Sequence, residues 1–219
     1  MKYFLLSICL IAATAFCQKT KKVVVENEVP EFKEVFYVLV DSPAVRHGDY
    51  KRTFGGRHKV EEKGQYDHGK KTGVWSFDGF DGTVEQKIDF SNQQILSTKP
   101  FKMLTSSFAM KAGRWVENTS ETLPLFLGGV GRATSIFLMH LRYPATARRL
   151  GVQGSVFVSG IVTKDGRLVD EQIEQGLGYG LDEESVRIIR MLPDEWLPVG
   201  WGSEPQESKV VLEIKYRLN

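Results

Sequence analysis

Histidines are the residues of this 219-residue chain that could most readily bind a metal ion or transfer a proton. The chain has four of them: His47, His58, His68 and His140. None of their spacings matches HExxH, in which two histidines share one face of a helix. Three carboxylates lie near the middle pair: Glu61, Glu62 and Asp67. With His58 and His68 they could form a metal site. Because the segment is polar and solvated side chains are its ordinary outcome, we expect no metal site.

Side chains for covalent catalysis are also lacking. No serine lies in a GxSxG turn, and the two cysteines, Cys9 and Cys17, lie in or beside an apolar N-terminal stretch. The GLGYG segment that starts at Gly176 lacks the Lys-Ser/Thr pair of a phosphate-binding loop. His140 lies on the apolar face of a predicted helix, where half-buried core histidines are common. We therefore expect no enzymatic activity, no catalytic residue and no cofactor.

The charge balance argues against a nucleic-acid partner. The chain has 29 Lys and Arg residues and 27 Asp and Glu residues, which gives a formal charge of +2. No large basic field is therefore expected. Hydrophobic residues make up 42% of the chain and charged residues 26%, which are ordinary values for a globular protein with a packed core.

The N-terminal segment has the features of an export signal. Lys2 supplies a positive charge, residues 3–13 are apolar apart from one serine, and residues 13–15 form an A-x-A cleavage site. The apolar run is shorter than the roughly 20 residues of a membrane-spanning helix. We predict a signal peptide over residues 1–17 and a periplasmic protein. The alternative is an uncleaved N-terminus that anchors the chain in the inner membrane.

Glycines, aromatic residues and short alternating runs predict consecutive β-hairpins over residues 18–98. A Gly-x-Tyr motif occurs at Gly48 and again sixteen positions later at Gly64. The second copy resembles a MORN-variant repeat, through Gly64, Tyr66, Gly69, Lys70, Gly73, Trp75 and Gly82. Stacked repeats of this kind would form a small curled β-layer. Residues 99–122 show no clear period and are predicted to be a linker or an irregular strand.

The segment after the linker begins with helical patterns. An amphipathic helix is predicted from apolar residues at helical spacing: Ala133, Ile136, Phe137, His140 and Leu141. Tyr143-Pro144 must end it, because Pro144 lacks an N–H and pushes the residue before it toward extended geometry. A second, short helix can run over residues 145–150, with Gly151 in the left-handed conformation that ends it.

Strands are predicted to follow. Residues 155–162 alternate as a strand, and Asp165-Gly166 predicts a two-residue hairpin turn into the next strand. Asp182 can cap a further helix, which Pro193 stops. In the last strand one face is apolar, with Val210, Leu212, Ile214, Tyr216 and Leu218. We expect an α+β fold in which helices pack on one side of a small antiparallel sheet, preceded by the all-β hairpin-repeat region.

Residues 123–219 resemble the C-terminal domain of TonB-like energy transducers. The resemblance rests on PLFLGG from Pro124, LRYPATARRLGVQGSVFV, VTKDGRLVDEQIEQG, GLDEESVRIIRMLP, WLPVG from Trp196, and the alternating last strand. It implies a periplasmic domain that binds a short peptide segment of an outer-membrane TonB-dependent receptor in transmembrane transport. The binding mode would be strand addition to an open sheet edge.

The resemblance also implies which residues touch the partner. They are Arg142, Tyr143 and Pro144, together with Lys209, Val211, Glu213, Lys215 and Arg217 of the last strand. We therefore expect the last strand to border the sheet. A homodimer is a further expected partner, and a membrane is one only if the N-terminus is retained.

One family feature is missing. Full transducers have a long proline-rich spacer, but the eight prolines of this chain are scattered without a run. The sequence therefore predicts an exported binding module fused to a repeat region. The alternative is a cell-envelope scaffold, in which the β-repeat region binds glycan or protein and the C-terminal domain mediates dimerisation.

Overall fold

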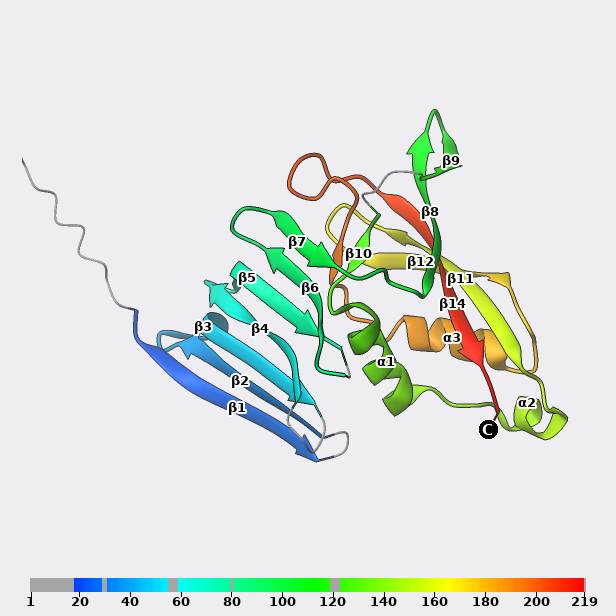
Figure 1. Ribbon diagram of the computed structural model, residues 1–219, viewed down its shortest axis with the longest axis horizontal. Helices are drawn as coiled ribbons and strands as arrows, with labels where there is room; N and C mark the ends of the chain where they lie inside the picture. The colour runs from blue at the N-terminus through cyan, green and yellow to red at the C-terminus, as the bar shows by residue number, and fades with distance from the viewer. Residues whose placement is uncertain (1–17, 29–30, 55–58, 80, 119–122, 219) are drawn as a thin grey trace, which may run out of the picture.

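The computed structural model describes residues 18–28, 31–54, 59–79, 81–118 and 123–218 (Figure 1). Over these residues the chain is mostly antiparallel β-sheet with few helices. The predicted signal segment, residues 1–17, lies outside the described residues. Within the described ranges, no helix combines the length and the apolar character that a membrane crossing requires.

The first sheet has seven strands, each paired antiparallel with the next one along the chain. The strands are β1 (Thr20–Glu28), β2 (Glu31–Leu39), β3 (Ser42–Phe54), β4 (Lys59–Asp67), β5 (Lys70–Asp78), β6 (Val84–Asp89) and β7 (Gln94–Thr98). The hairpins expected over residues 18–98 are therefore present. The resemblance to MORN-variant repeats remains a prediction.

The Gly-x-Tyr motifs face each other in this sheet. Gly48 on β3 lies opposite Tyr66 on β4, and Tyr50 lies opposite Gly64. The indole of Trp75 fills the space beside Gly64, where an added Cβ would lie 2.2 Å from the ring. That ring stacks on Tyr50 at a centroid distance of 5.4 Å and meets Tyr66 edge-on at 5.1 Å. Gly64 thus makes room for a buried aromatic cluster.

The second sheet has five strands in the order β12-β11-β14-β8-β9. The strands are β8 (Leu104–Lys111), β9 (Arg114–Glu117), β11 (Gly154–Val162), β12 (Leu168–Gln175) and β14 (Ser208–Tyr216). The remaining elements are the short pair β10 (Leu125–Phe126) and β13 (Trp196–Leu197), and the helices α1 (Gly129–His140), α2 (Ala145–Leu150) and α3 (Leu181–Ile189).

Of the two alternatives predicted for residues 99–122, a linker or an irregular strand, the strand is present, because residues 104–117 supply β8 and β9. One expectation about this sheet is wrong. β14 is not the border of the sheet, because β8 pairs with its first half, from Ser208 to Leu212. The other side of β14 pairs with β11 along its whole length. The last strand is therefore central, and its β8 side lacks a backbone partner only beyond Glu213, whose N–H donates to Met103 O.

The two faces of β14 alternate as the sequence predicts. Its buried face is made by Val210, Leu212, Ile214 and Tyr216, each no more than 2% exposed. All three helices add side chains to the same core, through Ala133, Ala147, Leu181 and Ile189. Burial of each large apolar side chain contributes about 1.5–3 kcal/mol relative to exposure.

The predicted break after α1 is confirmed. Leu141 ends the helix in an extended conformation, Pro144 caps the start of α2, and Gly151 ends α2 with a φ of 67°. The hairpin turn differs from the prediction, because residues 163–167 connect β11 to β12 and only Gly166, not Asp165, has a positive φ. α3 is capped by Gly180 instead of Asp182, whose carboxylate accepts hydrogen bonds from the N–H groups of Leu177 and Gly178.

α1 lies between the two sheets (Figure 1). Gln86 of β6 donates to the carbonyl of Phe126 and accepts from the N–H of Gly128, both at 2.9 Å. An ion-pair network continues the contact: Arg132 Nη1 lies 3.0 Å from Glu195 Oε2 and 3.9 Å from Glu62 Oε2, and Lys71 Nζ lies 2.7 Å from Glu195 Oε2. Side chains from both parts of the chain therefore form one interface.

Candidate partner-binding site

The open half of β14 borders a surface groove of about 260 Å³. The groove is lined by Lys102, Met103, Phe137, Leu141, Glu213, Ile214 and Lys215. These residues come from three places: the segment before β8, the end of α1 and the second half of β14. An apolar floor with charged side chains at its border is typical of a site for an extended peptide.

The backbone N–H and C=O groups of Lys215 in β14 point toward this groove. Earlier along the strand, the carbonyl of Val211 accepts a hydrogen bond from Thr105 Oγ1 at 3.0 Å, and the N–H of Glu213 donates to Met103 O at 2.8 Å. Hydrogen-bonding direction alternates along a strand, so the N–H and C=O of Lys215 point to the same side. Among the described residues, no strand pairs with β14 on this side beyond Leu212. Lys215 therefore offers a donor and an acceptor to an added strand.

The charged side chains of this region hold one another in place. Glu213 Oε1 accepts a hydrogen bond from Ser155 Oγ at 2.7 Å, and Glu213 Oε2 lies 3.1 Å from Lys215 Nζ. The hydrogen bond from Ser155, with that from Lys215, holds the pKa of the Glu213 carboxyl below its usual range. Glu213 is therefore an anion at neutral pH, flanked by the cations Lys102 and Lys215.

The predicted Tyr-Pro segment lies near the end of β14, but most of its contacts are made within the protein. The Tyr143 ring meets the buried Tyr216 ring edge-on at 5.6 Å, and its hydroxyl donates to the carbonyl of Val152. The Arg142 side chain is exposed, and its backbone N–H donates to Glu184 Oε1 at 2.6 Å. Pro144 is half-buried at the start of α2. Of these three residues, Arg142 has the most accessible side chain.

The predicted residues of the last strand fall into two groups. Lys209 and Val211 lie on the half of β14 that β8 covers, and Lys209 Nζ is paired with Glu174 Oε1 at 2.6 Å. Glu213 and Lys215 line the groove, and Arg217 follows the end of the strand in an exposed position. The structure therefore brings Glu213 and Lys215 to one open edge and leaves Lys209 and Val211 in the interior of the sheet.

The groove also contains residues that the sequence did not single out. They are Lys102, Met103, Phe137, Leu141 and Ile214. Phe137 and Leu141 belong to the apolar face predicted for the first helix, which identified them as core but not as a groove wall. Lys102 and Met103 lie in a segment without periodicity, so no sequence signal was available for them.

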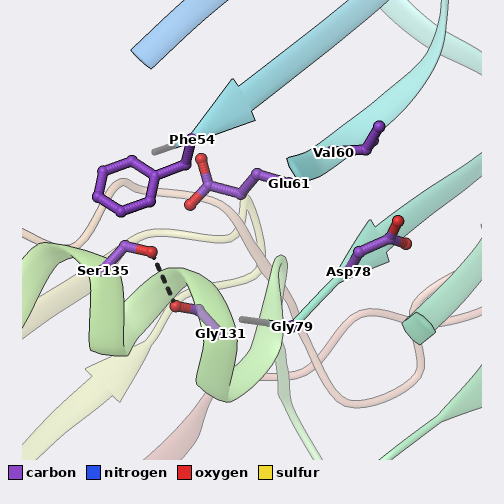
Figure 2. A pocket seen from close by; sticks show the side chains of 7 residues that line it. All are labelled: Phe54, Val60, Glu61, Asp78, Gly79, Gly131 and Ser135. Carbon is purple, nitrogen blue, oxygen red and sulfur yellow. Dashed lines mark hydrogen bonds between the residues drawn. The ribbon is translucent and has the colours of Figure 1, made fainter. Parts of the chain in front are cut away.

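A second cavity lies between the first sheet and α1 (Figure 2). It is lined by Phe54, Val60, Glu61, Asp78, Gly79, Gly131 and Ser135, and its volume of about 30 Å³ suits about one water molecule. Burial raises the pKa of both carboxyl groups, Glu61 and Asp78. Ser135 Oγ donates to the carbonyl of Gly131 at 3.1 Å. The cavity is too small for a peptide or a sugar.

The aromatic cluster of the first sheet is mostly part of the core. Tyr50, Trp75 and Phe77 are each at most 4% exposed, and they pack with Leu125, Leu127 and Leu197 of the C-terminal part. These three rings are therefore covered by protein, whereas Tyr66 and Phe90 at the border of the cluster are partly exposed.

Comparison with known proteins finds a family match in the C-terminal part. Residues 139–218 match the family described as Gram-negative bacterial TonB protein C-terminal. The match supports the TonB C-terminal family for this part of the chain, a transport-associated and non-enzymatic domain family of the cell envelope. No curated protein and no solved structure matches the chain. The matched residues include α2, α3 and β11 to β14, whereas β8, β9 and the first sheet lie outside the match.

Proposed function

We propose that this chain is a periplasmic TonB-like protein that binds an extended segment of an outer-membrane receptor in TonB-dependent transport. The receptor segment adds as a strand along the open half of β14, between Glu213 and Arg217. The observation that carries this proposal is the unpaired backbone of Lys215 beside the apolar groove. The family match over residues 139–218 supports the same reading.

The chemistry of the groove indicates which segments fit. Met103, Phe137 and Ile214 supply apolar contacts, and Lys102 and Lys215 supply positive charge. Main-chain hydrogen bonds would provide affinity, and these side chains would determine which receptor sequences bind. A segment that alternates apolar and acidic residues matches this arrangement.

The first half of β14 is closed to a guest in this structure because β8 pairs with it. A receptor strand at the open half would therefore lie in line with β8, as its continuation. The contact would be short, which favours transient binding. A longer contact would require β8 to leave the sheet.

The proposal is tested by changing the backbone of Lys215 separately from its side chain. Lys215→Pro removes the N–H that faces the groove, and a proline is tolerated at an open edge. Lys215→Ala keeps the N–H and removes the amine. We expect Lys215→Pro to weaken binding about tenfold or more and Lys215→Ala to weaken it less than about threefold, because each lost main-chain hydrogen bond costs roughly 1 kcal/mol and the adjacent strand geometry changes with it. The measurement is calorimetric titration of the full chain with synthetic N-terminal segments of outer-membrane receptors.

Equal affinities of the two Lys215 variants for those segments would contradict strand addition at this edge. An absence of any binding by the wild-type chain would contradict the receptor function itself. Circular dichroism of both variants gives the control for folding.

A further inference from the structure

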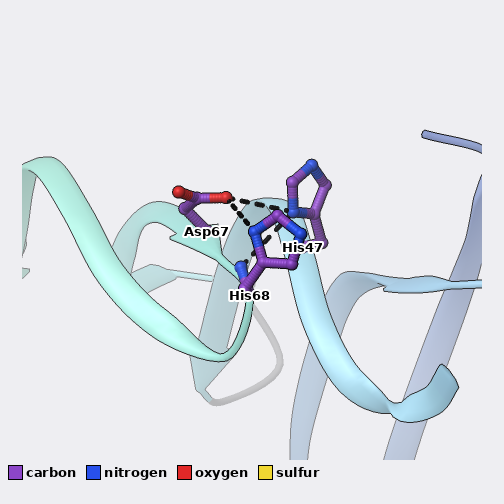
Figure 3. A group of neighbouring side chains, drawn as sticks. All are labelled: His47, Asp67 and His68. Atoms are coloured by element: carbon purple, nitrogen blue, oxygen red, sulfur yellow. Dashed lines mark hydrogen bonds and ion pairs between the residues drawn. The ribbon is translucent and has the colours of Figure 1, made fainter. Parts of the chain in front are cut away.

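Three side chains of metal-binding type converge on the first sheet (Figure 3). His47 comes from β3, Asp67 ends β4, and His68 lies in the turn between β4 and β5. Asp67 Oδ1 lies 2.6 Å from His68 Nδ1 and 3.3 Å from His47 Nδ1. One ligand atom from each residue lies within 4.8 Å of the other two.

The backbone fixes these three residues relative to one another. Gly48 pairs with Tyr66, which places His47 beside the end of β4. The turn residues His68 and Gly69 both have positive φ, 46° and 82°, as in the tightest hairpins. The N–H of Gly69 donates to the carbonyl of Arg46 at 2.8 Å, which ties the turn to β3. The cluster is therefore built on paired strands.

The hydrogen bonds within the cluster join the same atoms that would bind a cation. His47 Nδ1 accepts from the N–H of His68 at 3.3 Å, so its lone pair lies on this side of the ring. The same nitrogen lies 3.3 Å from the carboxylate of Asp67. A metal ion here would take the lone pair of His47 Nδ1 from its long contact with the His68 N–H and would replace the proton that His68 Nδ1 and Asp67 Oδ1 share at 2.6 Å. The side chains of Asp67 and His68 are 61% and 54% exposed, so an ion can reach the site from solvent.

We propose that His47, Asp67 and His68 form a binding site for a divalent transition-metal ion of the zinc and copper class. Two imidazoles and one carboxylate suit these borderline ions, whereas magnesium and calcium prefer an all-oxygen shell. Metal–ligand bonds of about 2.0–2.2 Å place tetrahedral ligands roughly 3.3 Å apart. The exposed side chains reach that spacing by small rotations. Water completes the coordination, and the ion links β3 to the β4–β5 turn.

The test uses the full chain, purified without a polyhistidine tag, and zinc chloride as the probe. We expect calorimetry to show one zinc ion per chain at this site with affinity on the order of micromolar. Zinc should raise the melting temperature, because an ion that binds the folded state shifts the unfolding equilibrium. Magnesium chloride at the same concentration should leave it unchanged.

Two asparagine variants separate this site from other zinc ligands. His68→Asn removes a ligand and creates an Asn-Gly turn, which is favoured at these backbone angles, so folding is preserved. His140→Asn is the matched control, because His140 lies at the end of α1. We expect His68→Asn to bind zinc about tenfold or more weakly and to show no zinc-induced rise in melting temperature. His140→Asn should match the wild type in both measurements. Equal zinc binding by His68→Asn and wild type, or no binding by wild type at millimolar zinc, would overturn the proposal.

Discussion

The two sheets of this protein differ in how far apart along the chain their neighbouring strands lie. In the first sheet every strand pairs with the next one in sequence. In the second, β14 pairs with β8 across about a hundred residues and with β11 across more than forty. Local hairpins can be predicted from turn and alternation signals, whereas the neighbours of β14 depend on contacts between distant segments.

The first sheet nevertheless depends on the second part of the chain for its core. Side chains at the β1 edge are largely exposed, with Val24 at 47%, whereas Trp75, Phe77 and Ile88 of β5 and β6 are fully buried. Leu125, Leu127 and Leu197 complete that cluster from the C-terminal side. A sheet whose strands all pair with their sequence neighbours is therefore not necessarily an independent domain.

The largest effect on this shared core is expected from Trp75→Ala. Removal of a fully buried indole leaves a cavity and costs about 3–5 kcal/mol of unfolding free energy. Because Leu125 and Leu197 belong to the same cluster, amide hydrogen exchange should accelerate in β10 and β13 as well as in the first sheet. Urea unfolding followed by circular dichroism measures the free energy.

Val74→Ala is the control for this prediction, because Val74 is the adjacent residue and is 52% exposed. We expect it to change stability by less than about 1 kcal/mol. Normal exchange protection of β10 and β13 in the Trp75 variant would show that the first sheet unfolds independently of the C-terminal part.

The next largest effect is expected at the ion-pair network between the two parts. Arg132→Ala leaves the carboxylates of Glu62 and Glu195 without their buried cation, which costs about 3 kcal/mol of stability. Arg190→Ala is the matched control, since Arg190 pairs with Glu171 at 3.0 Å but is 61% exposed, and it should cost less than about 1 kcal/mol. Thermal unfolding of both variants makes the comparison, and similar losses would show that the buried pair contributes no more than a surface pair.

The smallest effect is a pH dependence at Glu195. Burial alone would raise the pKa of this carboxyl, but Arg132 and Lys71 outweigh it and lower the pKa from 4.5 to about 2. The resulting stability is present above pH 4.5 and is lost as the pH falls toward 2. Glu195→Gln should therefore reduce stability by about 1 kcal/mol at pH 6, with the difference from wild type shrinking below pH 4. Urea titrations at both pH values test this, and a constant difference would contradict the assigned pair.

Local physics made much of the C-terminal part predictable from sequence. Alternation from Val210 to Tyr216 fixed the buried face of β14, because side chains in a strand point alternately to opposite sides. Pro144 and Gly151 marked the ends of helices, because each restricts or extends the allowed backbone angles. Features of this kind can be predicted because they depend only on residues that are close in sequence.

The position of β14 could not be predicted in the same way. β8 has the sequence LTSSFAMK, in which serine and threonine hide the alternation that identifies a strand. One of its two partners is β14, which lies about a hundred residues away, so no turn signal joins these two strands. The convergence of His47 with Asp67 was missed for a related reason, because strand pairing between β3 and β4, and not sequence spacing, brings them together.

The complete pairing of β14 with β11 has a mechanical consequence. A guest strand held at Lys215 and pulled along the strand axis would load all the β11–β14 backbone bonds at once, in shear, instead of opening them one by one from an end. A tether attached there would resist stretching over the full length of β14.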